Sequence, residues 1–217
     1  MHPRLRVPVS DTAGVQTLRE RLQTVAWAQE IKRLGAHGSN VPVQVSVSVQ
    51  RPDGAPPAGS CGGSEAARAT TVGTFSLNEL NRTLRRCDVL AFTLQNRDVD
   101  RSFYAYMIAV GPDAAVKRLH PNNAQNEDEA RIERGKSIEV GRHYRLTDVG
   151  VETLVLIVTR APIDPRKLEQ AGLNSRSDRP TSQLEAILMS AGRNKGDIEA
   201  PVEEWGGTAA NIDVEAL

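Results

Sequence analysis

The segment from Ser102 to Asn123 constrains the fold more than any other part of the chain. Two runs rich in aromatic and β-branched residues, 103–110 and 115–119, flank the turn sequence Gly111-Pro112-Asp113. Runs of this composition form strands, and glycine, proline and aspartate supply the turn between them. The segment closes with the corner Leu119-His120-Pro121-Asn122. It therefore predicts an antiparallel β-hairpin in the middle of the chain.

Further strand signals surround this hairpin. From Val41 to Val49, valine stands at every odd position with a small or polar residue between, which is the period of a strand with one buried face. Pro42 suits the start of that strand or an edge position. Strands are also expected at 89–95, 136–140, 143–146, 153–159 and in the segment 205–217. Many short strands without long helices between them favour an antiparallel β-sandwich.

The strand pattern divides the chain into three parts. Residues 1–40 form an N-terminal segment that is helical from about Asp11 to Leu34, because Val15, Leu18, Leu22 and Val25 recur at steps of three and four. This helix is expected to pack on the main domain, and a free helix that docks a partner is the alternative.

Residues 41–163 form the predicted sandwich, in which the run 52–73 is rich in Gly, Pro, Ala and Ser and is expected to be a long mobile loop. Residues 164–217 form an extension that is partly helical, with a helix expected at 181–191 and a last strand beginning at Trp205. The predicted class is mainly β, or α+β: an antiparallel β-sandwich with an N-terminal helix and a partly helical C-terminal extension.

Charge and hydropathy exclude several classes of function. Lys and Arg together number 27 and so do Asp and Glu, which gives a formal net charge of zero. Proteins that bind nucleic acid usually carry a basic excess, so no nucleic-acid partner is expected. No apolar run approaches the length of a membrane span, and the first residues lack the apolar core of a secretory signal. We therefore expect a cytoplasmic location without a membrane span.

The two cysteines, Cys61 and Cys87, are too few for a metal cage or a disulfide framework. They can pair in an oxidising compartment, but two separate thiols are the favoured interpretation. The oxygen-rich loop at 122–129 lacks the ligand spacing of a calcium site. The chain also lacks a glycine-rich phosphate loop and a zinc motif, so neither a metal nor a cofactor is expected.

One candidate nucleophile is present. Cys61 lies in a glycine-rich sequence whose backbone N–H groups could stabilise an oxyanion, and cysteine catalysis also needs a histidine base. A cysteine hydrolase that uses Cys61 with His120 or His143 is therefore the alternative function. A catalytic cysteine is normally held by a rigid scaffold, whereas Cys61 lies in the expected 52–73 loop. The favoured interpretation is that the chain has no catalytic residue.

Residues 87–163 resemble a bacterial domain-of-unknown-function family, number 4384. The likeness rests on a strand entered at Cys87, the aromatic strand 103–110, the corner Leu119-His120-Pro121-Asn122 and the apolar strand 153–159. His120 stands where the family has an aromatic residue, and the hairpin turn lacks the family's Asp-Gly pair.

The resemblance implies a non-catalytic β-sandwich domain that accompanies caspase-like cysteine peptidases or other signalling modules, often C-terminal to them. A regulatory role with a protein partner, such as a caspase-like peptidase domain, is therefore expected. Contacts to that partner or to a ligand are expected at Tyr104, Tyr106, His120 and Asn122. A weaker expectation is that the edge of the strand 41–49 accepts an extended segment of the partner.

Overall fold

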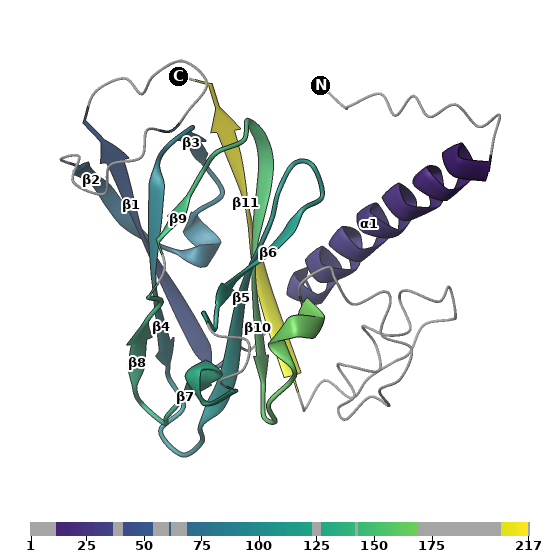
Figure 1. The fold of residues 1–217 in the computed structure, drawn as a ribbon. Coiled ribbons are helices and arrows are strands. Elements are labelled where there is room, and N and C mark those ends of the chain that lie inside the picture. Colours follow the sequence, from purple (N-terminus) through teal and green to yellow (C-terminus); the bar gives the residue numbers. More distant parts are fainter. Residues whose placement is uncertain are drawn as a thin grey trace.

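The computed structural model describes residues 12–36, 41–53, 61, 69–122, 127–141, 143–168 and 205–216. Within these residues the chain forms two β-sheets packed face to face and one helix that covers the outer face of the second sheet (Figure 1). The predicted mainly β sandwich with an N-terminal helix is confirmed. The elements, in chain order, are α1 (Thr12–Ala36), β1 (Val43–Pro52), β2 (Ala69–Ser76), η1 (Leu77–Glu79), β3 (Thr83–Arg85), β4 (Val89–Asn96), β5 (Phe103–Val110), β6 (Val116–His120), η2 (Glu127–Ala130), β7 (Arg131–Ile132), β8 (Ser137–Glu139), β9 (Tyr144–Arg145), β10 (Gly150–Thr159), η3 (Pro165–Leu168) and β11 (Trp205–Glu215).

The first sheet has the strand order β2-β1-β4-β8, with β9 also paired to β4. The second has the order β3-β11-β10-β5-β6, with β7 also paired to β5. All pairs are antiparallel except β3 with β11. The hairpin that the sequence predicts is confirmed as β5 and β6, where Val110 pairs with Val116. The other neighbour of β5 in the second sheet is β10, whereas β4 belongs to the first sheet and lies across the core from β5.

The main core fills the space between the two sheets. Alternate residues of each strand point into it, as the period of two in β1 and β4 requires. Full burial of a Val, Leu, Ile, Phe or Met side chain contributes about 1.5 to 3 kcal/mol, so this core is the main source of stability. Its central members are Val43, Val45, Val47 and Val49 of β1, Leu90, Phe92 and Leu94 of β4, Ala105, Met107 and Ala109 of β5, Leu154, Leu156 and Val158 of β10, and Ala210, Ile212 and Val214 of β11.

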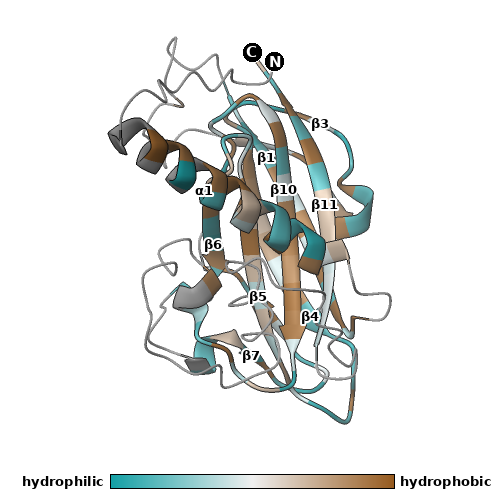
Figure 2. Ribbon diagram, turned by 90° about the vertical axis from the view of Figure 1, so that its right-hand side faces the viewer, coloured by the Kyte–Doolittle hydropathy of each residue, from teal (hydrophilic) through white to brown (hydrophobic). Residues whose placement is uncertain are grey.

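A second core lies between the second sheet and α1. Helix α1 lies over the outer face of the second sheet (Figure 2). Its residues Ala28, Ile31 and Leu34 are buried in one cluster with Val155 and Ile157 of β10. Strand β10 is therefore covered on both faces. This double burial explains why the residues 153–159 are an almost unbroken apolar run instead of an alternating one.

Glycines allow the helix to approach β11 closely. A Cβ atom at Gly207 would lie only 2.4 Å from the carbonyl oxygen of Leu34, and one at Gly35 would lie 2.8 Å from Cβ of Ala209. The sequence predicts a helix as far as about Leu34, and α1 continues to Ala36. The structural demand on Gly35 is thus close packing on the sheet.

Two expectations about the first sheet were wrong. The expected loop 52–73 overlaps β2, which begins at Ala69, because the β-branched residues Thr70 and Thr71 pair with Arg51 and Gln50 at the end of β1. As a consequence β1 is an inner strand, flanked by β2 and β4, and its edge is not open to a partner. Pro42 precedes the first residue of β1, as expected for a strand start.

Strand β11 confirms the expected last strand, and it lies inside the second sheet, between β10 and β3. The extension that follows the sandwich begins with the short helix η3. The expected helix at 181–191 lies outside the described residues.

Candidate functional site

The four expected contact residues lie on β5, β6 and the corner that follows β6. Tyr106 is fully buried, and its hydroxyl donates to the carbonyl oxygen of Ile163 at 3.3 Å and accepts from the N–H of Ile163 at 2.9 Å. Tyr104 is half-buried beside the second core. Tyr106 therefore fastens the chain after β10 to the sheet, and of the two tyrosines only Tyr104 reaches the surface.

His120 is buried at the end of β6, with 2% of its surface exposed. Burial lowers the pKa of its imidazole from 6.5 to about 4, and the nearby Glu129 only partly opposes that shift. The imidazole is therefore neutral at neutral pH. The peptide bond from His120 to Pro121 is cis, which turns the chain sharply into the corner.

Asn122 is the exposed member of the set. Its backbone N–H donates to the Glu129 carboxylate at 2.8 Å, so the corner is fastened to the η2 segment. The structure thus gathers His120 and Asn122 around Glu129, whereas Tyr106 bonds to Ile163. In the described part of the chain, no group of three or more His, Cys, Asp or Glu side chains is arranged to hold a metal ion.

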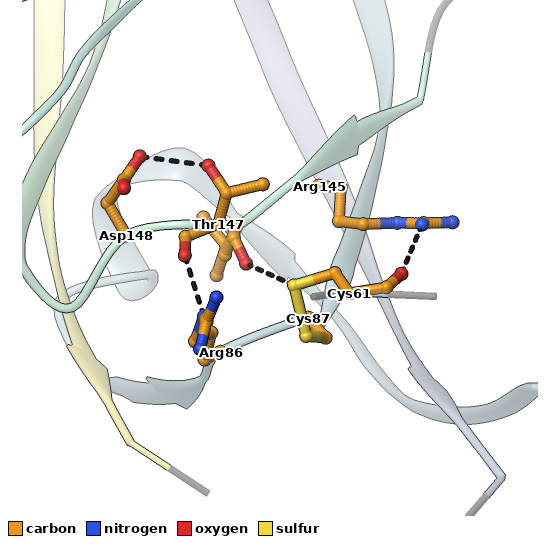
Figure 3. The surroundings of a disulfide bond; sticks show 7 residues. Cys61, Arg86, Cys87, Arg145, Thr147 and Asp148 are labelled. Carbon is orange, nitrogen blue, oxygen red and sulfur yellow. Dashed lines mark hydrogen bonds between the residues drawn. A yellow bond between two sulfur atoms is a disulfide. The ribbon is translucent and has the colours of Figure 1, made fainter. Parts of the chain in front are cut away.

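Cys61 and Cys87 form a disulfide, with Cα atoms 5.2 Å apart (Figure 3). The interpretation of two separate thiols was therefore wrong. The physical reason is that Cys61 lies beside Cys87, just before β4, within disulfide reach. The sulfur of Cys61 is bonded in this state, so it can act as a nucleophile only after reduction. His143, one of its two expected bases, is exposed.

The disulfide belongs to a fastened end of the first sheet. Arg145 donates from Nη1 to the carbonyl oxygen of Cys61 at 2.6 Å, and the N–H of Cys87 donates to the Leu146 carbonyl at 2.7 Å. Figure 3 shows Arg145 beside the Cys61 carbonyl and Arg86 reaching the carbonyl oxygen of Thr147. These contacts hold the residues before β4 against β9 and the residues that follow it.

A buried ion pair strengthens the same end. Asp88 is 1% exposed, and its two carboxylate oxygens accept hydrogen bonds from Nε and Nη2 of Arg51 at 2.9 and 2.8 Å. The Asp88 carboxylate also accepts from the N–H of Arg85. This two-point geometry joins β1 to the turn before β4, and removal of one partner would leave the other charge poorly solvated.

A polar cluster that sequence reasoning missed lies between the two sheets. Glu152 of β10 is 2% exposed and accepts a hydrogen bond from the hydroxyl of Tyr144, which belongs to β9 in the other sheet. The Lys117 ammonium lies 5.7 Å from the centre of the Tyr144 ring. A sequence signal existed: Glu152 has the same strand parity as the buried Leu154 and Leu156, so alternation points its side chain inward.

Burial dominates the protonation of this cluster. It raises the pKa of Glu152, and the hydrogen bond from Tyr144 and the charge of Lys117 only partly oppose that rise. Burial also raises the pKa of Tyr144, and the neighbouring Glu152 carboxylate adds to the rise. The cluster can hold a proton between the sheets, and it joins β9 to β10.

The N-terminal half of α1 carries a second apolar face. Val15, Leu22 and Val25 are 51%, 56% and 41% exposed, whereas Ile31 is fully buried. Leu22 and Ile31 are nine residues apart, or about two and a half helical turns, so they point to opposite sides of α1. In both views the N-terminal half of α1 extends beyond the sheet that its C-terminal half covers (Figures 1 and 2). The apolar residues of α1 therefore form two faces, and only one of them packs on the sheet.

Comparison with known proteins gives no family assignment. No family model matches the chain, and no curated protein matches it. No helix in the described ranges is both long and apolar enough to cross a membrane.

Proposed function

We propose that this chain is a non-catalytic interaction module that regulates a caspase-like peptidase or a related signalling protein. The observation that carries the binding part of the proposal is the outer face of α1, formed by Val15, Leu22 and Val25. Leucine and valine side chains gain about 1.5 to 3 kcal/mol each on full burial, so a face of three such residues favours a partner that covers them. Helical anchors at such spacing suit the apolar groove of another protein.

The resemblance of residues 87–163 to the family that accompanies caspase-like peptidases supports the choice of partner. It implies an accessory domain. The Cys61–Cys87 disulfide supports the non-catalytic assignment, because it occupies the sulfur that the alternative hydrolase would use. The disulfide also favours an oxidising compartment, since cytosolic thiols are kept reduced. The cytoplasmic location expected from the sequence stays a prediction.

The test measures binding of the full chain to a recombinant caspase-like peptidase domain from the same source. Leu22→Glu places a charge in the outer face and should weaken binding by about tenfold or more, because the carboxylate would have to be desolvated on docking. Val99→Glu is the matched control, since Val99 is a 72% exposed valine in the turn between β4 and β5, away from α1.

Both variants should keep the melting temperature of the parent chain, because neither residue is buried. The peptidase activity is measured in the same mixtures, to separate regulation from simple binding. Absence of binding at high concentration would contradict the accessory role. Binding that Leu22→Glu leaves unchanged would contradict α1 as the contact surface.

A further inference from the structure

The outer edge of β2 differs from every other sheet edge in the described part of the chain. It is eight residues long and contains neither a charged residue nor a proline. The other edge strands are short or charged: β3 and β8 have three residues each, β7 and β9 two each, and β6 carries Lys117 and Arg118. Natural proteins protect sheet edges by these means, and an unprotected edge is a template for strand pairing. Among the edge strands that the structure describes, β2 alone lacks this protection.

The side chains of β2 are self-complementary in an antiparallel arrangement. At one end, Thr70 donates its hydroxyl to the Asp53 carboxylate at 2.9 Å. At the other end, the Arg82 guanidinium lies over the Phe75 ring, 4.2 Å from its centre. Both Asp53 and Arg82 are exposed. Two antiparallel copies of β2 would place the acidic end of each against the basic end of the other.

A β-bulge at Val72 allows Thr70 of one copy to lie opposite Phe75 of the other, with both side chains on the same face of the sheet. Thr70 and Phe75 are five residues apart, so in a regular strand their side chains would lie on opposite faces. The pairing of β2 with β1 skips Val72, and Thr70 and Phe75 therefore pair with Arg51 and Val47, which lie on one face of β1. A two-fold axis between Val72 and Gly73 then brings Thr70 opposite Phe75 of the second copy on a shared face.

On the other face, the same axis brings the exposed Thr71 opposite Thr74 of the second copy. Opposed threonines are a favourable cross-strand pair. The bend that the bulge imposes on one strand is also imposed on its copy, which a straight peptide strand would not match. Isologous pairing of this kind closes after two copies. It leaves no further β2 edge open.

We infer that the chain forms a homodimer in which β2 pairs with β2 of a second copy, antiparallel about an axis between Val72 and Gly73. The first sheets of the two copies then become one continuous sheet. The axis lies on the first sheet, and α1 covers the second (Figure 1). The dimer therefore leaves the outer face of α1 open, and it can form whether or not that face binds a peptidase.

Charge reversal tests the inferred register. Asp53→Arg and Arg82→Asp each turn both interfacial ion contacts of the homodimer into repulsive ones. Each variant alone should raise the dimer dissociation constant by about tenfold, measured by analytical ultracentrifugation of the full chain. An equal mixture of the two variants restores both attractive contacts in a heterodimer, and should dimerise as tightly as the parent chain. Asp100→Arg, at an exposed site away from β2, is the matched control and should change nothing.

A second measurement does not depend on variants. In the parent chain, hydrogen exchange at the backbone amides of residues 69–76 should slow as the protein concentration rises through the dimer transition. A monomer at all concentrations would overturn the proposal. A dimer that the two reversals do not weaken, or that their mixture does not restore, would overturn the β2 register.

Discussion

Removal of the Cys61–Cys87 disulfide should destabilise the protein by about 3.5 kcal/mol. The two cysteines are 26 residues apart in the sequence, and the loop-closure entropy that such a cross-link removes from the unfolded chain corresponds to about this free energy at 25 °C. For a chain of this length, about 1 kcal/mol shifts the melting temperature by about 2 to 4 °C. The Cys61→Ala/Cys87→Ala variant should therefore melt about 7 to 14 °C below the oxidised parent.

The assay is equilibrium unfolding in urea, with and without a reductant. The reductant should bring the parent chain close to the double variant and should leave the variant unchanged. Because the cross-link keeps the unfolded chain compact, its removal should also increase the dependence of the unfolding free energy on urea concentration. That slope separates an effect on the unfolded chain from the loss of native contacts such as Arg145 to the Cys61 carbonyl.

Three results would refute this reasoning. The first is a pair of free thiols in the unreduced, denatured protein, measured by thiol titration. The second is a loss of less than about 1 kcal/mol in the double variant, since the loop model predicts several times as much. The third is a loss of the expected size with an unchanged urea dependence, which would assign the effect to native contacts. Alkylation of thiols inside intact cells then tells whether the bond exists where the protein works.

The remaining predictions concern His120 and Gly207. Because burial holds the pKa of His120 at about 4, below its ordinary 6.5, the folded state resists protonation, and stability should fall by up to about 3 kcal/mol as the pH drops from about 6.5 to about 4. His120→Phe should remove that part of the pH dependence in urea unfolding measured across this range, and an unchanged pH profile would contradict the assignment. Gly207→Val should cost about 1 to 3 kcal/mol by calorimetry, because a Cβ atom there meets the Leu34 carbonyl oxygen at 2.4 Å. Asp213→Val on the same strand, where Asp213 is exposed, is the control and should change the melting temperature little.

The parts of the fold that the sequence predicts are those encoded by a local period. Strand β1 is visible because valine alternates with small or polar residues, and the hairpin of β5 and β6 is visible because its turn residues separate two apolar runs. Strand β2 was missed because Gly73 and the Gly- and Pro-rich residues before it have the composition of a loop. Its strand character comes from pairing with β1, which local composition does not encode.

The candidate sites depend on contacts between distant segments, and the sequence predicts them less well. Cys61 meets Cys87 although the two are 26 residues apart in the sequence. Tyr144 and Glu152 meet because β9 and β10 belong to opposite sheets. The spacing of Val15, Leu18, Leu22 and Val25 predicts a helix that packs on the main domain, whereas Leu22 is exposed and lies on the side of α1 opposite the buried Ile31. Periodicity counts apolar residues, but it does not tell which neighbour covers them.

The two proposed surfaces follow from the residues that the fold leaves uncovered. Two of the side chains expected to carry chemistry are used inside the molecule: Cys61 in a disulfide and His120 in a buried corner. The outer face of α1 and the edge of β2 have the opposite character. The first is an apolar helix face and the second is an uncharged strand edge. A folded chain normally covers both kinds of feature with its own residues. Because such patterns favour contact with further protein surface, these two elements are the places where a partner gains most by binding.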